Sequence, residues 1–159
     1  MKKEMTANEL GLKVILYFEK DELISVDLKS ISISKHNNYP VHQRKIEKSI
    51  QNYFSKRSDE FSKLPLDLSG YTEMEKKVLK AMRKVPFGST VSYKELASMS
   101  GNSRMSRFVG NVCKKNRFPL LIPCHRVIKS DGTLGGYSGG INIKKKLLKF
   151  ENHSGSWVE

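Results

Sequence analysis

A tight turn joins two predicted helices in Ser92-Tyr93-Lys94-Glu95-Leu96-Ala97-Ser98-Met99-Ser100-Gly101-Asn102-Ser103. Ser92 and Glu95 form a capping box, in which each side chain bonds a backbone N–H of the other residue, so a short helix begins there and ends at Gly101. Asn102 or Ser103 then caps a further helix that runs to about Asn116. Two helices joined by a glycine turn form a helix-turn-helix, which lays one helix along a DNA groove. Most helix pairs of this kind are only structural, so the pattern needs support from the rest of the chain.

The distribution of charge gives that support. Residues 1–70 hold 12 Lys and Arg against 10 Asp and Glu, whereas residues 71–159 hold 17 against 6, so nearly all of the formal charge of +13 lies in the second half. A basic face confined to one half favours nucleic acid over an anionic membrane, because no basic amphipathic helix with an aromatic face is present. On charge alone, a solvated lysine-rich surface is the alternative.

Length and composition set the broad class of the protein. The 159 residues suffice for one ordinary domain or two small ones, and 38% hydrophobic with 28% charged residues is typical of a globular protein. The longest apolar run, Val14–Phe18, is too short to cross a bilayer, and the first residues lead into no apolar segment, so we expect neither secretion nor a membrane span. Two cysteines make no disulfide framework, which favours the reducing cytoplasm.

The amino-terminal part has the pattern of an α/β domain. Residues 12–18 and 23–28 predict a β-hairpin, and isoleucines alternate with serines in Ser30–Ser34, which predicts a third strand. Apolar residues recur every fourth position through Gln43–Phe54, as in an amphipathic helix. The polar stretch from 55 to 70 is broken by proline and glycine, so we place a boundary there, with an α/β support domain at 1–66 and a mainly α-helical domain at 67–159. The latter opens with a capping box at 72–75, and its helix is ended by a proline and a glycine at 86 and 88.

The chemistry is concentrated in Leu120-Leu121-Ile122-Pro123-Cys124-His125-Arg126-Val127-Ile128. Proline stiffens the backbone just before the cysteine, which is thereby presented at a fixed bend. A free thiol is mostly protonated at neutral pH, so a nucleophilic Cys124 needs a base, for which His125 is the candidate, and Arg126 adds positive field. The base needs a carboxylate to orient it, and Glu151 is the candidate because it ends a predicted helix, Asn142–Glu151. The alternative is an inert buried thiol.

These residues resemble the O6-alkylguanine-DNA alkyltransferases, also called methylated-DNA–protein-cysteine methyltransferases. The resemblance covers about residues 71–159, and Ile122-Pro123-Cys124-His125-Arg126-Val127 is its most specific part. Further matches are Phe87-Gly88, Ser92-Tyr93, Gly101-Asn102, Arg107-Phe108-Val109-Gly110, Asn116, Gly136-Tyr137-Ser138-Gly139-Gly140 and Glu151. A chance coincidence of all of these is implausible.

The resemblance implies a DNA repair reaction that happens once per molecule. Cys124 would take the alkyl group from O6 of guanine, in O6-methylguanine and as a possible second substrate O4-methylthymine, and would keep it as a thioether. His125 would deprotonate Cys124 through a water, and Glu151 would hold His125 in the right tautomer. Asn116 would brace the cysteine loop, and Tyr93 would donate a proton to the departing guanine. No cofactor and no metal are implied.

The resemblance also implies how double-stranded DNA carrying the lesion is bound. The target base would leave the stack to reach the buried thiol. Arg107 would fill the gap in the duplex, and Gly110, one turn later, would let the backbone approach DNA closely, although helix packing explains that glycine equally well. Tyr137 and Ser138 of the glycine-rich loop would line the base pocket. The positions of Asn102 and Ser130 align with DNA contacts in relatives, but each also suits a cap or a turn.

Other functions are less compatible with the residues. In relatives the amino-terminal domain resembles ribonuclease H without its catalytic residues, so scattered acids there are read as surface residues rather than as a nuclease. The chain has no cysteine before Cys113, so His36 and His42 are read as surface histidines rather than zinc ligands. Cys113 itself is read as a packing residue. Two alternatives stay open: a Cys-His-carboxylate thiol hydrolase, which would turn over, and a lesion-binding protein without transfer, which would need no cysteine. We expect a monomer.

Overall fold

The computed structural model describes residues 2–7, 11–19, 22–30, 41–56, 61–151 and 157. The chain begins with an antiparallel sheet of β1 (Lys2–Ala7), β2 (Leu12–Glu19) and β3 (Glu22–Ser30), in that spatial order. The predicted hairpin is therefore confirmed as β2 and β3. The strand predicted at Ser30–Ser34 lies almost wholly outside the described residues. Strand β1 is absent from the predictions because three of its six residues are charged, which hides the apolar alternation.

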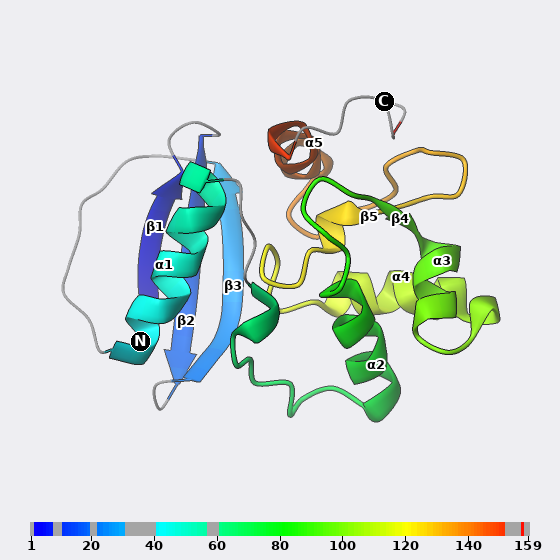
Figure 1. Cartoon of the computed structure of the whole chain (residues 1–159), viewed down its shortest axis with the longest axis horizontal. Coiled ribbons are helices and arrows are strands. Elements are labelled where there is room, and N and C mark those ends of the chain that lie inside the picture. Colours follow the sequence, from blue (N-terminus) through cyan, green and yellow to red (C-terminus); the bar gives the residue numbers. More distant parts are fainter. Residues whose placement is uncertain are drawn as a thin grey trace.

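Helix α1 (Val41–Lys56) lies across one face of the sheet (Figure 1). It includes the predicted segment Gln43–Phe54 and extends it by two residues at each end. Ile46, Ile50 and Tyr53 are buried on its inner side, where they join the hydrophobic core with the buried side chains of β2 and β3. The periodic apolar residues that predict the helix are thus the residues that contact the core.

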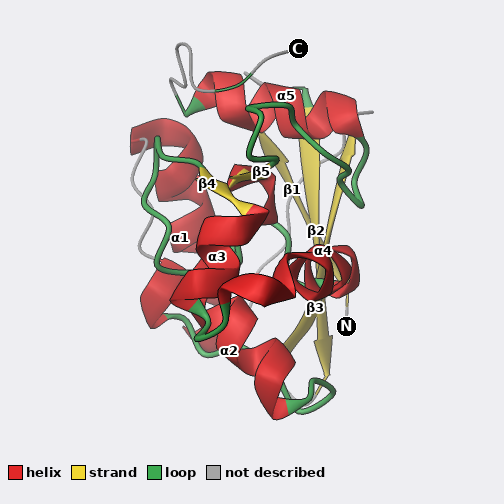
Figure 2. Ribbon diagram, turned by 90° about the vertical axis from the view of Figure 1, so that its right-hand side faces the viewer, coloured by secondary structure: helices red, strands yellow, loops and turns green. Residues whose placement is uncertain are grey.

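The second half is mainly helical, and its helices gather beside β3 and beyond one end of the sheet (Figures 1 and 2). Its longer helices are α2 (Glu73–Met82), α3 (Tyr93–Met99), α4 (Ser106–Lys115) and α5 (Ile141–Phe150). Single 3-10 turns are η2 (Phe61–Lys63), η3 (Ser103–Met105) and η4 (Cys124–Arg126). The predicted helices after residues 72, 92 and 141 are confirmed within one residue at their starts.

Both predicted capping boxes are present. The side chains of Thr72 and Ser92 accept from the backbone three residues later, and the glutamates there bond back to the cap. The helix predicted from Asn102 or Ser103 to Asn116 differs, because it is split into η3 and α4. Asn102 caps only the 3-10 turn, by accepting from the backbone N–H of Arg104 at 3.0 Å, and α4 begins without a side-chain cap.

A short parallel pair of strands brings distant parts of the second half together. Strand β4 (Val91–Ser92) pairs with β5 (Val127–Ile128), with Val91 opposite Val127. Helix α3 starts directly after β4, and the turn η4 ends directly before β5. The pairing therefore places the first residue of α3, Tyr93, next to the loop that carries Cys124.

The two halves share one hydrophobic core, which includes buried residues of β2, β3, α1, α2, α3, α4 and α5. The backbone also connects them, since the N–H of Val26 in β3 donates to the carbonyl of Arg117 at 2.7 Å. The boundary at residues 66 and 67 stays a prediction. Among the described residues, no helix combines the length and the apolar character that crossing a membrane requires.

Candidate active site

The predicted nucleophile lies in a buried loop between α4 and β5. All residues from Phe118 to Ile128 are buried, and Leu120 has a φ of 76°, a left-handed conformation that is rare for a residue with a side chain. Pro123 precedes η4, in which the N–H of Arg126 donates to the carbonyl of Pro123 at 2.9 Å. Cys124 is 3% exposed. The loop thus holds the thiol inside the protein on a sharply turned backbone.

Asn116 connects the start of this loop to its end. Its side-chain nitrogen donates to the carbonyl of Ile122 at 2.9 Å and to the sulfur of Cys124 at 3.1 Å. Its side-chain oxygen accepts from the backbone N–H of Phe118 at 3.0 Å. One buried amide therefore satisfies three groups of the loop, which offsets the strained backbone at Leu120. A donor aimed at sulfur also favours the charged form of the thiol.

Glu151 lies directly after α5 and receives hydrogen bonds from several directions. Its Oε1 is 2.9 Å from Nε2 of His125 and accepts from the hydroxyl of Tyr53 at 2.5 Å. Arg126 binds it with two donors, Nε to Oε2 and Nη2 to Oε1, each at 2.9 Å. The backbone N–H of Gly88 donates to Oε2 at 3.3 Å. His125 is wholly buried, and its Nδ1 has no hydrogen-bond partner among the described residues.

The environment keeps the thiol and the imidazole uncharged in the free protein. Burial raises the pKa of Cys124, and the Asn116 donor and the ammonium of Lys144 offset this only in part. Burial lowers the pKa of His125, against the opposing effect of Glu151. With Nε2 of His125 donating to Glu151, Nδ1 carries the lone pair and is free to accept a proton. A neutral pair of this kind is able to pass a proton from sulfur to imidazole when a reacting group arrives.

A cavity of about 70 Å³ reaches the thiol. It is lined by Tyr93, Gly110, Cys113, Lys114, Cys124, Gly136, Tyr137 and Ser138. Burial raises the pKa of Tyr93 to about 12, so its hydroxyl stays protonated as a donor. The hydroxyl of Tyr137 is buried at the cavity and interacts with the thiol of Cys124. The cavity therefore offers polar groups to a ligand beside the nucleophile.

Glycines make room for Tyr93 at the cavity. A Cβ built on Gly135, which has a φ of 65°, would lie 2.9 Å from the hydroxyl oxygen of Tyr93. A Cβ on Gly110 would lie 3.9 Å from the Tyr93 ring, which is an ordinary contact. Packing alone therefore does not require a glycine at position 110, whereas position 135 requires one for both space and backbone conformation.

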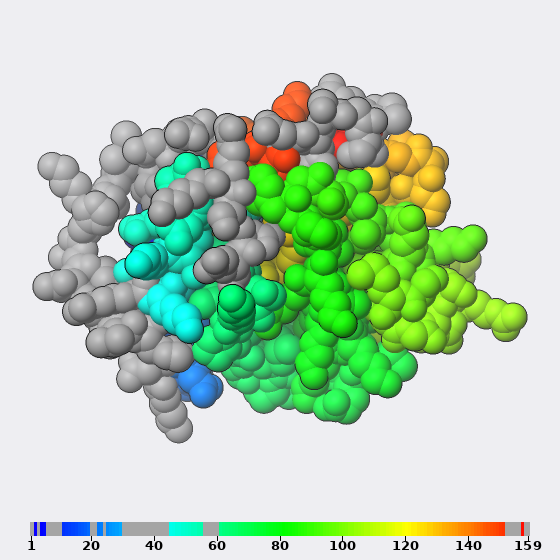
Figure 3. Space-filling model, viewed as in Figure 1, coloured from blue at the N-terminus to red at the C-terminus, as the bar shows by residue number. Residues whose placement is uncertain are grey.

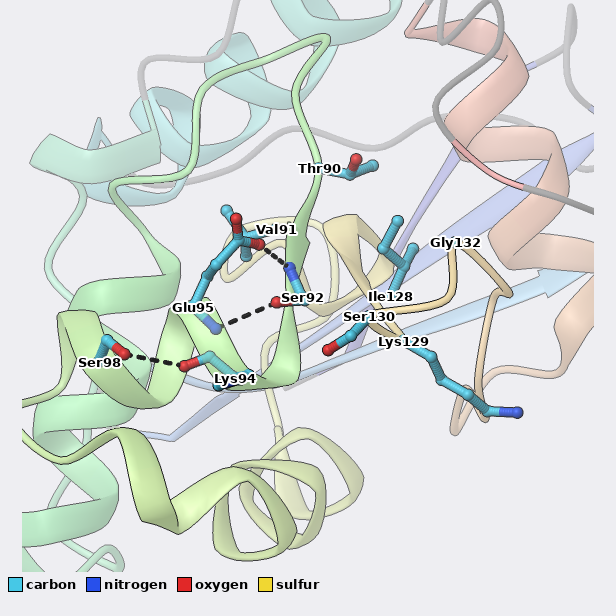
Figure 4. Close-up of a pocket in the computed structure, with 10 residues that line it drawn as sticks. All are labelled: Thr90, Val91, Ser92, Lys94, Glu95, Ser98, Ile128, Lys129, Ser130 and Gly132. Atoms are coloured by element: carbon cyan, nitrogen blue, oxygen red, sulfur yellow. Dashed lines mark hydrogen bonds between the residues drawn. The ribbon is translucent and has the colours of Figure 1, made fainter.

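The structure brings the predicted catalytic residues together around Cys124 but leaves three of the predicted DNA-binding residues away from the cavity. Arg107 is exposed near the start of α4, and Asn102 is exposed at its cap position. Ser130 lines a separate hollow of about 510 Å³. In Figure 4, Lys94 and Glu95 at the start of α3 lie on one side of this hollow, and Lys129 and Ser130 lie on the other.

The structure corrects one expectation and adds two residues. Arg126 was expected to add positive field at Cys124, but its guanidinium pairs with Glu151 and donates to the carbonyl of Val85 at 2.7 Å. Tyr53, in the first half of the chain, contacts Glu151 and was not among the candidates. The sequence feature that could have identified it is a tyrosine on the apolar face of a predicted helix, because a buried hydroxyl needs a hydrogen-bond partner. Cys113, read as a packing residue, is buried and also lines the cavity.

Metal binding is not indicated by any group of side chains in the described ranges. No group of three or more His, Cys, Asp and Glu residues with the geometry of an ion site occurs among them. Both cysteines are free thiols.

Comparison with known proteins agrees with this geometry. Residues 73–153 match the family described as 6-O-methylguanine DNA methyltransferase, DNA binding domain. The methylated-DNA–protein-cysteine methyltransferase of Methanothermobacter thermautotrophicus is 40% identical over 121 residues, 76% of this chain and 68% of that protein. The protein of the same name from Methanosarcina barkeri is 36% identical over 150 residues, 94% of this chain and 90% of that protein.

Solved structures give the same assignment over nearly the whole chain. The crystal structure of Mycobacterium tuberculosis OGT in complex with DNA superposes with a TM-score of 0.74 at 28% identity, over 95% of this chain and 92% of that one. The O6-methylguanine-DNA methyltransferase of Pyrococcus kodakaraensis also superposes with a TM-score of 0.74, at 26% identity. With a buried cysteine that precedes a histidine hydrogen-bonded to a buried glutamate, this chain belongs to the methylated-DNA–protein-cysteine methyltransferase family.

Proposed function

We propose that the protein repairs DNA by transferring the alkyl group of O6-alkylguanine to Cys124, once per molecule. The observation that carries the proposal is the sulfur of Cys124 at the base of a small cavity, held by Asn116 at 3.1 Å and adjacent to the His125–Glu151 pair. The aromatic side chains of Tyr93 and Tyr137 line this cavity beside the thiol of Cys124, which suits a planar base.

The reaction moves one alkyl group and one proton. His125 takes the proton of Cys124 at Nδ1, directly or through a water, while Glu151 holds the ring by Nε2. The sulfur attacks the alkyl carbon, a carbon–sulfur bond forms, and the bond between that carbon and O6 breaks. The electron pair leaves with guanine, and Tyr93 donates a proton to the base, which leaves as neutral guanine. The proton held by His125 then restores the Tyr93 phenol through solvent, so overall one proton passes from the thiol to the base. The thioether on Cys124 is stable, so each molecule acts once.

Binding to DNA is proposed for the surface of α3 and α4, acting as a helix-turn-helix. Figure 3 shows α3 and the turn that follows it, green to yellow-green, exposed on the right-hand side of the molecule. Because the thiol is 3% exposed, the target base would have to leave the stack and enter the cavity, with Arg107 filling the gap in the duplex. Lys94, Lys129 and Ser130 around the larger hollow suit the phosphates beside the displaced nucleotide. Asn102 and Gly110 lie on the same two-helix unit.

The rest of the proposal concerns the whole protein. The amino-terminal sheet and α1 would form the ribonuclease H-like support domain of 1–66, and residues 67–159 would carry DNA binding and transfer. Two free thiols, one of them the nucleophile, suit a reducing compartment such as the cytoplasm. We propose that it acts as a monomer on double-stranded DNA.

Mass mapping after a single incubation tests the proposal. The protein is mixed with a duplex oligonucleotide that contains O6-methylguanine, and the peptides are sequenced by mass spectrometry. We expect one methyl group on Cys124, none on Cys113, no methylation in Cys124→Ala, and a strongly reduced rate in His125→Ala. Methyl on Cys113 would refute the assignment. Turnover beyond one equivalent would identify a hydrolase instead.

The role of Arg107 is tested with two substrates. Arg107→Ala should slow repair of duplex DNA more than transfer from free O6-benzylguanine, because the free base needs no extrusion from a stack. Lys77→Ala, which removes an exposed cation from α2, is the matched control and should leave the ratio of the two rates unchanged. Equal losses on both substrates in Arg107→Ala would remove the proposed role.

A further inference from the structure

Tyr53 belongs to α1, in the half of the chain to which no catalytic residue is assigned, yet its hydroxyl donates to Oε1 of Glu151 at 2.5 Å. The same oxygen lies 2.9 Å from Nε2 of His125. We infer that Tyr53 is a positioning residue of the transfer site, which anchors Glu151 and so determines how firmly His125 holds a proton. The inference rests on the proposed function, because it assigns the amino-terminal helix a part in the proton transfer from Cys124.

The ring of Tyr53 is held in place by other aromatic rings. Ring centroids of Phe61, Phe87 and Phe150 lie 5.4, 5.5 and 5.5 Å from its own, and its side chain is fully buried. These neighbours come from η2, the segment after α2, and the end of α5, so the ring is fixed from three elements. Burial and the adjacent carboxylate raise the pKa of Tyr53 well above its ordinary value, so the hydroxyl remains a donor.

The hydroxyl and the imidazole share one carboxylate oxygen. Every donor to Oε1 of Glu151 draws on the negative charge that would otherwise stabilise a protonated His125. Without the hydroxyl, that charge would be more available to the imidazolium, and His125 would hold a proton more tightly. Only the neutral imidazole of His125 is able to accept the proton of Cys124. If the pKa of His125 rises, the neutral form appears only at higher pH, so the acid limb of the transfer rate would move to higher pH.

The other charged and titratable groups around the pair are unchanged by removing that hydroxyl. His125 faces Glu151, the guanidinium of Arg126 and the ammonium of Lys144. Glu151 faces the phenol of Tyr137 as well. Tyr53→Phe deletes one oxygen, keeps the ring among its aromatic neighbours and leaves all of these groups in place, so its effect on pH dependence isolates the hydrogen bond.

The pH profile of single-turnover transfer tests the inference. Wild type, Tyr53→Phe and Tyr17→Phe are compared on a duplex that contains O6-methylguanine. Tyr17 is the matched control, because its hydroxyl donates to Asp27 in the sheet at 3.2 Å, away from Glu151. We expect the acid limb of Tyr53→Phe to shift upward by about half a unit to one unit, which lowers its rate there by roughly threefold to tenfold. The Tyr17→Phe profile should overlay wild type.

A second measurement needs no substrate. The ¹⁵N shifts of the His125 ring, followed by NMR across pH, should show protonation at higher pH in Tyr53→Phe than in wild type. Equal titration of His125 in both proteins overturns the inference, as does a rate that falls equally at every pH with an unmoved limb. A failure of the proposed function would be distinguishable from this: wild type itself would not be methylated, irrespective of the pH at which His125 is protonated.

Discussion

At the residue scale, the site combines a proposed nucleophile and a proposed base that are both buried and both uncharged at rest. Burial raises the pKa of Cys124 and lowers that of His125, so neither group is in its charged form before substrate binds. Charge then develops in a buried space, where each fixed donor has more effect than it would in solution. The donor nearest to the developing negative charge is the amide of Asn116.

Removing the Asn116 side chain should slow transfer. Asn116→Ala loses the N–H on the sulfur and the two bonds that brace residues 118 and 122, so we expect the single-turnover rate with free O6-benzylguanine to fall about tenfold or more. Asn142→Ala, at an exposed position of α5, is the control. An unchanged rate in Asn116→Ala would contradict the role.

A glycine beside Tyr93 gives a prediction about stability. Gly135→Ala places a side chain at a φ of 65° and a carbon 2.9 Å from the Tyr93 hydroxyl, so we expect a loss of about 1–2 kcal/mol in the free energy of unfolding. Gly136→Ala, where an added Cβ meets nothing within 4 Å, should differ little from wild type. Chemical denaturation of the three proteins measures both values. Equal stability of the two variants would disprove the steric requirement.

At the scale of elements, the arrangement of α2 and α4 depends on one carboxylate. Glu75 bonds back to its cap residue, Thr72, and accepts from the ammonium of Lys115, at the end of α4, at 2.7 Å. These donors lower the pKa of Glu75 to about 2, with Lys115 as the largest cause. The packing of α4 against α2 is therefore supported by the Glu75–Lys115 ion pair as well as by apolar contacts.

The pH dependence of stability tests this support. The pKa of Glu75 is lower in the folded state than its ordinary value of 4.5, so its charge stabilises the fold above pH 4.5, and this is lost as pH falls towards 2. Glu75→Gln keeps the shape and the acceptor oxygen but lacks the charge. We expect wild type to be the more stable protein at pH 7 and the two to converge near pH 2. Denaturation midpoints measure the gap; Glu73→Gln, in an exposed ion pair, is the control. A gap that is constant with pH would contradict the prediction.

At the scale of the whole molecule, two features work together: a basic second half and a first half that reaches into the site. The amino-terminal sheet meets the cysteine loop through Val26 and Arg117, and α1 meets Glu151 through Tyr53. The cavity is thus supported from behind by the first half, while the exposed side of α3 and α4 stays available. Positive charge on the second half suits a surface that binds the DNA backbone irrespective of sequence.

Salt should weaken DNA binding while leaving the chemistry unaffected. Phosphate contacts release counterions, so we expect the affinity for duplex DNA to fall about tenfold or more between about 50 and about 200 mM salt. The rate of transfer from free O6-benzylguanine should stay nearly constant over the same range, because the cavity is buried. Fluorescence anisotropy and single-turnover kinetics measure the two quantities. A flat affinity would exclude the proposed electrostatic binding.

Local sequence patterns determined much of this protein. Capping boxes at Thr72 and Ser92, the periodic apolar residues of α1, the β-forming residues of β2 and the partial alternation of β3 each predict their element, because these are local properties of the chain. The order Pro123-Cys124-His125 predicts the thiol and its base. Because such a base needs a carboxylate to orient it, Glu151 is predicted as the third residue from its place at the end of a helix.

Tertiary structure decided which groups share a hydrogen bond or a cavity. Tyr53 reaches Glu151 across 98 positions of sequence, Arg126 turns to the carboxylate instead of the thiol, and Cys113 joins Cys124 at the cavity. No local pattern encodes these, because each depends on how α1, α4 and α5 pack on the shared core. Periodicity shows that a side chain is buried, but only the packed structure shows which buried polar group it meets.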